Sequence, residues 1–170
     1  PIIITRCTNA IGPQGPGSAP GQSDEKFPVI LCRKLLAGET VQIHTVDGVP
    51  CSRFYVHVRK MCSAVVHVLE RGECIDGRDG VGIYHIAGEQ EITNVELVKF
   101  AAKTLGVDAK WELVERPPNR LKPDLRYCLD DAELRALGWS PEVGFWDGLS
   151  ETVLSYAPAK PAAPADTPRG

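Results

Sequence analysis

The chain has 170 residues, of which 43% are hydrophobic and 24% are charged, and its formal net charge is −3. These values are typical of one globular domain with a core of its own. The small negative charge gives no general attraction to nucleic acid or to anionic membranes. No apolar run approaches the roughly 20 residues that span a bilayer.

The chain starts without Met, on the apolar run 1–4. Natural termini are usually polar and frayed, so we expect this start to be a cut within a longer protein. It also lacks the charged and small-residue features of a signal peptide. The six cysteines include no Cys-x-x-Cys pair, which in a chain of this size favours free thiols and a cytoplasmic protein.

Apolar patterns and turn residues predict strands and helices in alternation. In chain order they predict a strand over 2–7, a Gly/Pro-rich loop over 12–21, a helix over 24–37 closed by Gly38, a strand over 41–44, a turn at 46–49 and a strand over 52–56. The second half predicts a helix over 58–69, a loop over 71–80, a strand over 81–87, a helix over 93–105, a strand over 111–114, a basic loop over 116–126 and helices over 130–137 and 145–156.

Two of these helices carry local signals of their own. Thr93 and Glu96 have the spacing of a capping box. The apolar stripe of the helix over 58–69 is expected to consist of Met61, Val65, Val68 and Leu69. The pattern as a whole favours an α/β fold in one domain over 1–156, followed by a disordered Pro/Ala-rich tail over 157–170.

Two polar clusters are candidates for ligand binding. Thr8 and Asn9 follow the first strand and precede Gly12, where open α/β sheets bind ligands. Taken alone, a plain strand-to-loop transition, with Asn9 bonded to its own backbone, is the simpler explanation. Arg53 interrupts an apolar strand, and its planar guanidinium matches a phosphate group. The alternative is an arginine on the solvent face of an edge strand.

A third cluster is the basic loop, in which prolines restrict the chain. It could make a second phosphate contact, or it could be an ordinary solvated loop. Its cationic residues are Arg116, Arg120, Lys122 and Arg126.

The residues that carry common enzyme chemistry are not arranged in catalytic motifs. The four histidines lack metal-ligand spacing, and the chain has no Gly-x-Gly-x-x-Gly or P-loop motif and no nucleophile elbow. Three tyrosines, Tyr55, Tyr84 and Tyr127, are followed four positions later by residues other than Lys. We therefore expect binding residues but no catalytic residue and no metal site in this chain.

Six short motifs resemble, in the same order, those of the C-terminal half of nucleotide-sugar 4,6-dehydratases, which are extended short-chain dehydrogenase/reductases. They are R-C-T-N-x-x-G-P from Arg6, E-K-F-P-V-I from Glu25, S-R-F-Y-V from Ser52, Y-H-I-A-G from Tyr84, D-L-R-Y-C-L-D from Asp124 and L-G-W from Leu137. The resemblance implies the C-terminal, substrate-binding lobe of this fold, with strands that complete a Rossmann sheet.

The resemblance also implies a partner half that precedes this chain and binds NAD through a glycine loop. That half would supply a catalytic Tyr-x-x-x-Lys pair, so this chain alone would lack the cofactor loop and the pair and would be inactive. The enzymes of this family oxidise the sugar at C4, eliminate water and return the hydride. The full-length protein would act on a nucleotide-sugar, as a homodimer.

Carried over residue by residue, the resemblance places Cys7 and Thr8 beside the cofactor. It assigns substrate binding to Asn9, Glu25, Lys26, Gln42, His44, Arg53, His85 and Arg120. Gln42 and His44 would lie along the base, and Arg53 and Arg120 would hold the diphosphate.

The chain departs from the family motifs around the nucleotide. His85 stands where the family usually has Asn, and 120–124 replaces an R-P-G-H-D sequence. A non-catalytic nucleotide-sugar-binding or structural subunit and a nucleotide-sugar epimerase therefore stay open as alternatives to a dehydratase.

Overall fold

The three-dimensional structure is a computed structural model that describes residues 2–13, 26–79, 81–115 and 124–157. The first two residues of the predicted helix over 24–37, most of the basic loop and nearly all of the predicted tail lie outside these segments. Within them, none of the helices combines the length and the apolarity needed to cross a bilayer.

The described strands alternate with helices along the chain, as expected for an α/β fold. They are β1 (Ile4–Cys7), β2 (Asn9–Ile11), β3 (Val41–Val46), β4 (Val49–Pro50), β5 (Ser52–His57), β6 (Ile83–Ile86), β7 (Glu91–Thr93), β8 (Trp111–Glu115) and β9 (Arg126–Tyr127). The helices are α1 (Phe27–Leu36), α2 (Val58–Arg71), α3 (Asn94–Leu105), α4 (Ala132–Ala136) and α5 (Phe145–Leu154).

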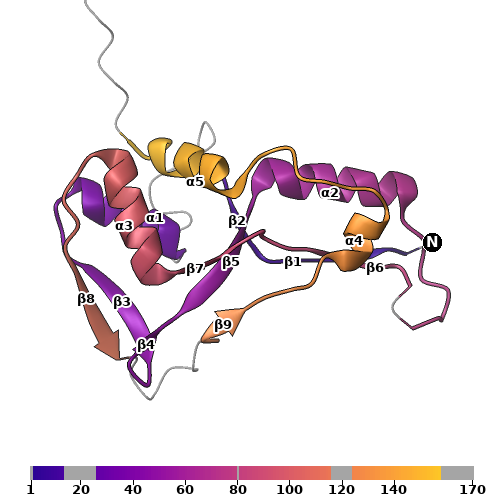
Figure 1. The fold of residues 1–170 in the computed structure, drawn as a ribbon, viewed down its shortest axis with the longest axis horizontal. Helices are drawn as coiled ribbons and strands as arrows, with labels where there is room; N and C mark the ends of the chain where they lie inside the picture. Colours follow the sequence, from indigo (N-terminus) through magenta and orange to yellow (C-terminus); the bar gives the residue numbers. More distant parts are fainter. Residues whose placement is uncertain (1, 14–25, 80, 116–123, 158–170) are drawn as a thin grey trace, which may run out of the picture.

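The strands form three groups, and β5 lies at the centre of one of them. It pairs in parallel with β2 and β9 and antiparallel with β7. β1 pairs in parallel with β6, and β3 pairs in parallel with β8 and antiparallel with β4. Figure 1 shows β5 running between two parts of the molecule, with α2 and α4 beside β1 and β6 at one end and α1 and α3 beside β3 and β8 at the other.

Each part has its own hydrophobic core. The first packs β3 and β5 against α1, α3 and α5, and the second packs β6 against α2 and α4. Strand β5 contributes to both, because Tyr55 is buried in the first core and Val56 in the second. Its side chains alternate between opposite faces, as in any strand.

The capping box is confirmed. The Thr93 hydroxyl accepts a hydrogen bond from the Glu96 main-chain N–H at 3.1 Å, and the Glu96 carboxylate accepts one from the Thr93 N–H at 2.8 Å. The helix that these residues begin, α3, ends before Gly106, which has φ 68°. Gly38 likewise adopts φ 69° after α1, as predicted.

The helix α2 is confirmed, and three of the four residues of its predicted apolar stripe, Met61, Val65 and Val68, pack in the second core. The fourth, Leu69, is 70% exposed, and α2 also buries Lys60 and Ala64. The strands β2 and β7 were not predicted, because each has only three residues and carries polar side chains. The predicted helix over 130–137 is shorter, and Asp130 precedes it, accepting the Ala132 N–H at 3.0 Å.

Candidate functional site

A cleft of about 1200 Å³ lies where β2, β3 and β5 approach α1 and α5. Its described lining contains no Asp or Glu but three cationic side chains, from Lys26, Lys34 and Arg53. In a chain with a net charge of −3 this is a local excess of positive charge. Such a cleft favours an anionic ligand.

The structure brings together six of the residues predicted to bind substrate or cofactor. They are Thr8, Asn9, Lys26, Gln42, His44 and Arg53, and all line this cleft. They come from segments far apart in the sequence, so only the tertiary fold makes them neighbours. Glu25 and Arg120 lie outside the described residues.

Strand β5 places Arg53 and Tyr55 on the face toward the cleft, two positions apart. Arg53 is half-buried, and one of its Nη atoms donates to the main-chain oxygens of Ser52 at 2.6 Å and Asp124 at 2.8 Å. These two acceptors fix the guanidinium in place. Burial raises the pKa of Tyr55 to about 12, while the charge of Arg53 acts in the opposite direction.

Strand β3 alternates between core and cleft. Val41, Ile43 and Thr45 are buried, whereas Gln42 and His44 are exposed on the opposite face. The Gln42 amide donates to the Glu112 carboxylate of β8 at 3.0 Å, which sets the direction of the Gln42 side chain. This strand therefore presents polar side chains at the edge of the cleft.

Lys26 is the residue before the first turn of α1, and its exposed position leaves the ammonium accessible. Its main-chain oxygen accepts the N–H groups of Val29 and Ile30, at 3.0 and 3.2 Å. No acidic residue lies in the first turn of α1. The positive end of the helix dipole and the lysine charge thus act in the same direction.

Thr8 is buried between β1 and β2, at 4% exposure. Its main-chain N–H donates to the Ile86 oxygen at 3.1 Å, and its hydroxyl accepts the Gly88 N–H at 3.0 Å. Asn9, the next residue, is exposed on β2 and pairs with Tyr55 in the sheet.

Cys7 and His85 are both in described segments, yet they lie outside the lining of the cleft. Cys7 packs against the second core, where burial raises the pKa of its thiol. His85 has its Nδ1 atom 3.0 Å from the main-chain oxygen of Asp130. Their assignment to cofactor and substrate stays a prediction without support from this cleft.

Other residues of the cleft were not predicted from the sequence. They are Lys34, Tyr55, Asn94, Thr152 and Tyr156. Asn94 follows the capping threonine of α3, and the last two come from α5 and the residues after it. Tyr55 belongs to the S-R-F-Y-V motif. No local sequence signal marks the other four, because the tertiary fold alone carries them to the cleft.

Tyr156 and Lys160 have the Tyr-x-x-x-Lys spacing, which corrects the expectation that the chain lacks such a pair. The spacing places two side chains on one face only within a continuous helix. Tyr156 follows the end of α5 at Leu154, and Lys160 lies outside the described residues. The described helix therefore does not present this pair as the family's catalytic helix would.

A second polar group lies behind the cleft, around His57 and Lys60. Both residues are 4% exposed. Burial lowers the pKa of His57, and the nearby charge of Arg59 lowers it further. Burial also lowers the pKa of Lys60, against the opposing effect of Glu89. Among the described residues, no cluster of His, Cys, Asp and Glu could hold a metal ion.

We compared the chain with protein-family models and with curated proteins. No protein-family model matches the chain. A curated relative, dTDP-glucose 4,6-dehydratase from Streptomyces niveus, is 37% identical over 156 residues, which are 91% of this chain and 41% of the relative. The chain thus spans less than half the length of that relative, and the match falls on its C-terminal half.

Solved structures agree with this match. The dTDP-glucose 4,6-dehydratase from Bacillus anthracis, in complex with NAD, superimposes with a TM-score of 0.69 at 33% identity, covering 92% of this chain and 44% of that one. The UDP-glucose 4-epimerase from Thermotoga maritima, with UDP-glucose, gives a TM-score of 0.67 at 29% identity, covering 91% and 45%. Both confirm the predicted C-terminal lobe of an extended short-chain dehydrogenase/reductase fold.

Proposed function

We propose, from the homology of this chain to the C-terminal half of dTDP-glucose 4,6-dehydratases, that it is the nucleotide-sugar-binding part of an NAD-dependent 4,6-dehydratase. The observation that carries the proposal is the cleft between β3, β5 and α1, whose described lining has three cations and no carboxylate. A nucleotide diphosphate supplies the complementary negative charge.

Arg53 and Lys26 are the residues that we assign to the diphosphate, together with Arg120 from outside the described segments. A hydrogen bond to a charged group contributes roughly 1.5–3 kcal/mol, so each arginine changes the affinity by about tenfold to a hundredfold. Gln42 and His44, at the edge strand β3, are assigned to the base.

Thr8 and Asn9 are assigned to the region between sugar and nicotinamide. The Thr8 hydroxyl accepts the Gly88 N–H, so its own proton is directed away from that contact and can be donated to a ligand oxygen. An NAD bound to the complete protein would supply the hydride chemistry at the sugar C4. The residues of this chain would bind and orient the sugar for that transfer.

Calorimetric titration with dTDP and UDP tests the binding proposal, with thymidine and uridine as ligands that lack the diphosphate. We expect one of the diphosphates to bind and both nucleosides to bind much more weakly, because the cations have no phosphate to contact. Equal affinity for thymidine and dTDP would contradict the assignment of this cleft to a diphosphate.

An epimerase is the second candidate, favoured by the similarity to the Thermotoga maritima enzyme. Product analysis of the complete enzyme separates the two: a dehydratase releases a 4-keto-6-deoxy sugar, whereas an epimerase releases the sugar inverted at one carbon. The non-catalytic alternative is favoured by the departures from the family motifs, such as His85 in place of Asn, and it predicts binding without either product. Homodimer formation, cytoplasmic location and the single domain over 1–156 stay predictions.

A further inference from the structure

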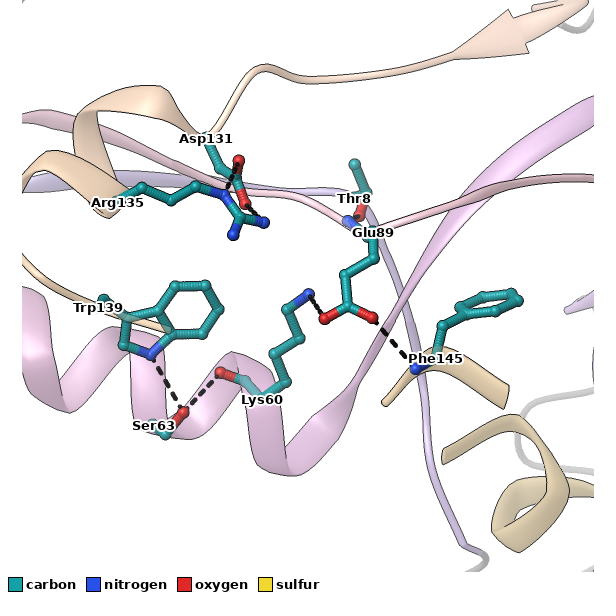
Figure 2. Close-up of polar contacts among 9 residues, drawn as sticks. Thr8, Lys60, Ser63, Glu89, Asp131, Arg135, Trp139 and Phe145 are labelled. Carbon is teal, nitrogen blue, oxygen red and sulfur yellow. Dashed lines mark hydrogen bonds and ion pairs between the residues drawn. The ribbon is translucent and has the colours of Figure 1, made fainter. Parts of the chain in front are cut away.

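An ion pair between a buried lysine and a glutamate whose side chain is 27% exposed lies directly behind the cleft. The Lys60 ammonium of α2 is 3.1 Å from one carboxylate oxygen of Glu89, which lies between β6 and β7 (Figure 2). The Lys60 side chain is 3% exposed, and its ammonium also lies 5.6 Å from the centre of the Trp139 ring. Lysine is seldom buried this deeply without a partner. The pair is therefore a specific contact between two distant segments.

Glu89 uses its second oxygen to hold α5. This oxygen accepts the main-chain N–H of Phe145, the first residue of that helix, at 3.1 Å (Figure 2). The other end of α5 brings Thr152 and Tyr156 to the cleft. One carboxylate thus joins α2 to the helix that forms a wall of the cleft.

Gly88, the residue before Glu89, is held against both Thr8 and β5. Its N–H donates to the Thr8 hydroxyl at 3.0 Å. A side-chain carbon at this position would overlap the main chain of Tyr55, so the segment packs flat on β5. Thr8 and Tyr55 both line the cleft.

A small internal cavity of about 10 Å³ shows how close the ion pair is to the cleft. Lys60 and Glu89 line this cavity together with Tyr55 and Ile11, and these last two residues also line the cleft. If the ion pair moved, the side chains of Ile11 and Tyr55 would pass the displacement on to the wall of the cleft.

Burying the Lys60 ammonium is an inefficient way to stabilise a fold, because the lysine loses its hydration and a hydrophobic residue of similar size often does as well or better. We propose that Lys60 is a positioning residue, which through Glu89 holds the Thr8 hydroxyl and α5 in the arrangement that binds the nucleotide-sugar. This inference rests on the proposed function. Lys60 is not part of the described lining of the cleft and acts through the segment 87–89.

Two double variants separate positioning from stability. Lys60→Met/Glu89→Met removes both charges and also the acceptor for the Phe145 N–H. Lys60→Met/Glu89→Gln removes both charges but keeps a side-chain oxygen for that N–H. Leu134→Ala, in the second core, is the control that lowers stability without touching the cleft.

The measurements are calorimetric titration of each 170-residue variant with dTDP and amide hydrogen exchange of Gly88 and Phe145. We expect Lys60→Met/Glu89→Met to bind dTDP on the order of tenfold to a hundredfold more weakly, as small displacements of binding groups do. Both amides should exchange faster than in the natural chain. The Gln variant should keep the Phe145 protection and part of the affinity, and Leu134→Ala should keep the full affinity.

Natural affinity and natural amide protection in both double variants would overturn the proposal and leave the pair a structural contact. If Lys60→Met/Glu89→Met does not fold, Lys60→Met/Glu89→Gln tests the proposal in its place. Natural dTDP affinity and natural protection of the Gly88 amide in that variant would overturn it. If the natural chain binds neither dTDP nor UDP, the proposed function fails, and the exchange of the two amides then decides the positioning role alone.

Discussion

The Arg53 guanidinium donates to the main-chain oxygen of Asp124 at 2.8 Å, so the same side chain lines the cleft and ties β5 to the segment before β9. An arginine held in this way is already oriented before a ligand arrives. The conformational entropy of the Arg53 side chain is then lost when the protein folds and not when the ligand binds. The two roles of Arg53 make different predictions for its removal.

For Arg53→Ala we expect the affinity for dTDP to fall about tenfold to a hundredfold, since a charge-assisted bond to phosphate is lost. Calorimetric titration measures this. Arg78→Ala is the control, because Arg78 is an exposed arginine whose partners, Glu73 and Asp76, lie away from the cleft. Unchanged affinity with a lower free energy of unfolding would mean that Arg53 only joins the two segments.

Lys60→Met alone should lower the free energy of unfolding, because it removes the cation that faces the Glu89 carboxylate. The loss should be smaller than the roughly 3–5 kcal/mol of a fully buried pair, since the Glu89 side chain is partly exposed to water. The double variant Lys60→Met/Glu89→Met should recover most of that loss, since no unpaired charge remains. Urea denaturation measures both. A double variant as unstable as the single one would show that the Phe145 contact of Glu89, and not the charge, dominates stability.

Stability should fall as the pH is lowered through the usual range of histidine. Burial lowers the pKa of His57 below 6.5, so the folded state binds fewer protons than the unfolded state just below that pH. The stabilising contribution of neutral His57 is complete above pH 6.5 and is lost as the pH falls toward the folded-state pKa.

The charged groups that face His57 are Arg59 and Glu151 along with Lys60 and Glu89. Glu151 is 3.6 Å from Nε2 and favours protonation, but Nε2 has no hydrogen-bond partner among the described residues. Burial therefore has the larger effect. Thermal unfolding of the natural chain and of His57→Gln at pH 7.5 and 5.5 checks this, and an equal loss of stability in both would assign the pH dependence to other groups.

Thr93→Ala should destabilise the chain by about 1 kcal/mol, because it removes the hydroxyl that caps the first turn of α3. Thr104→Ala, near the other end of the same helix, deletes the same atoms without a cap. Thermal unfolding compares them. If the two substitutions cost the same, the capping box contributes nothing beyond the loss of a hydroxyl and a methyl group.

Local patterns predicted the features whose causes are local. The capping box of α3 and the glycines after α1 and α3 depend on residues within one turn of each other. The alternation of β3 was predicted from Val41 to His44, because burial of one sheet face leaves a pattern of apolar and polar residues in the sequence. The cationic character of Lys26 and Arg53 was visible, but their convergence on one cleft came from the family resemblance and not from spacing.

The burial of Lys60 could not be predicted, because its cause is not local. A lysine on a helix is expected to lie in water, so the predicted apolar stripe of α2 left out Lys60 and extended to Leu69. The partner, Glu89, is 29 positions later in the sequence, and only the packing of the segment 87–89 against β5 brings it near. The same applies to Thr152 and Tyr156, which α5 carries to the cleft.

Strand β5 places Tyr55 in one core and Val56 in the other, on opposite faces of a single strand. Loss of packing in one core would therefore disturb the main chain of β5, which also carries a buried residue of the other core. Denaturation should accordingly proceed as one cooperative transition, with ligand affinity and the packing of both cores disappearing at the same midpoint. The cleft would then have no partly unfolded form that still binds.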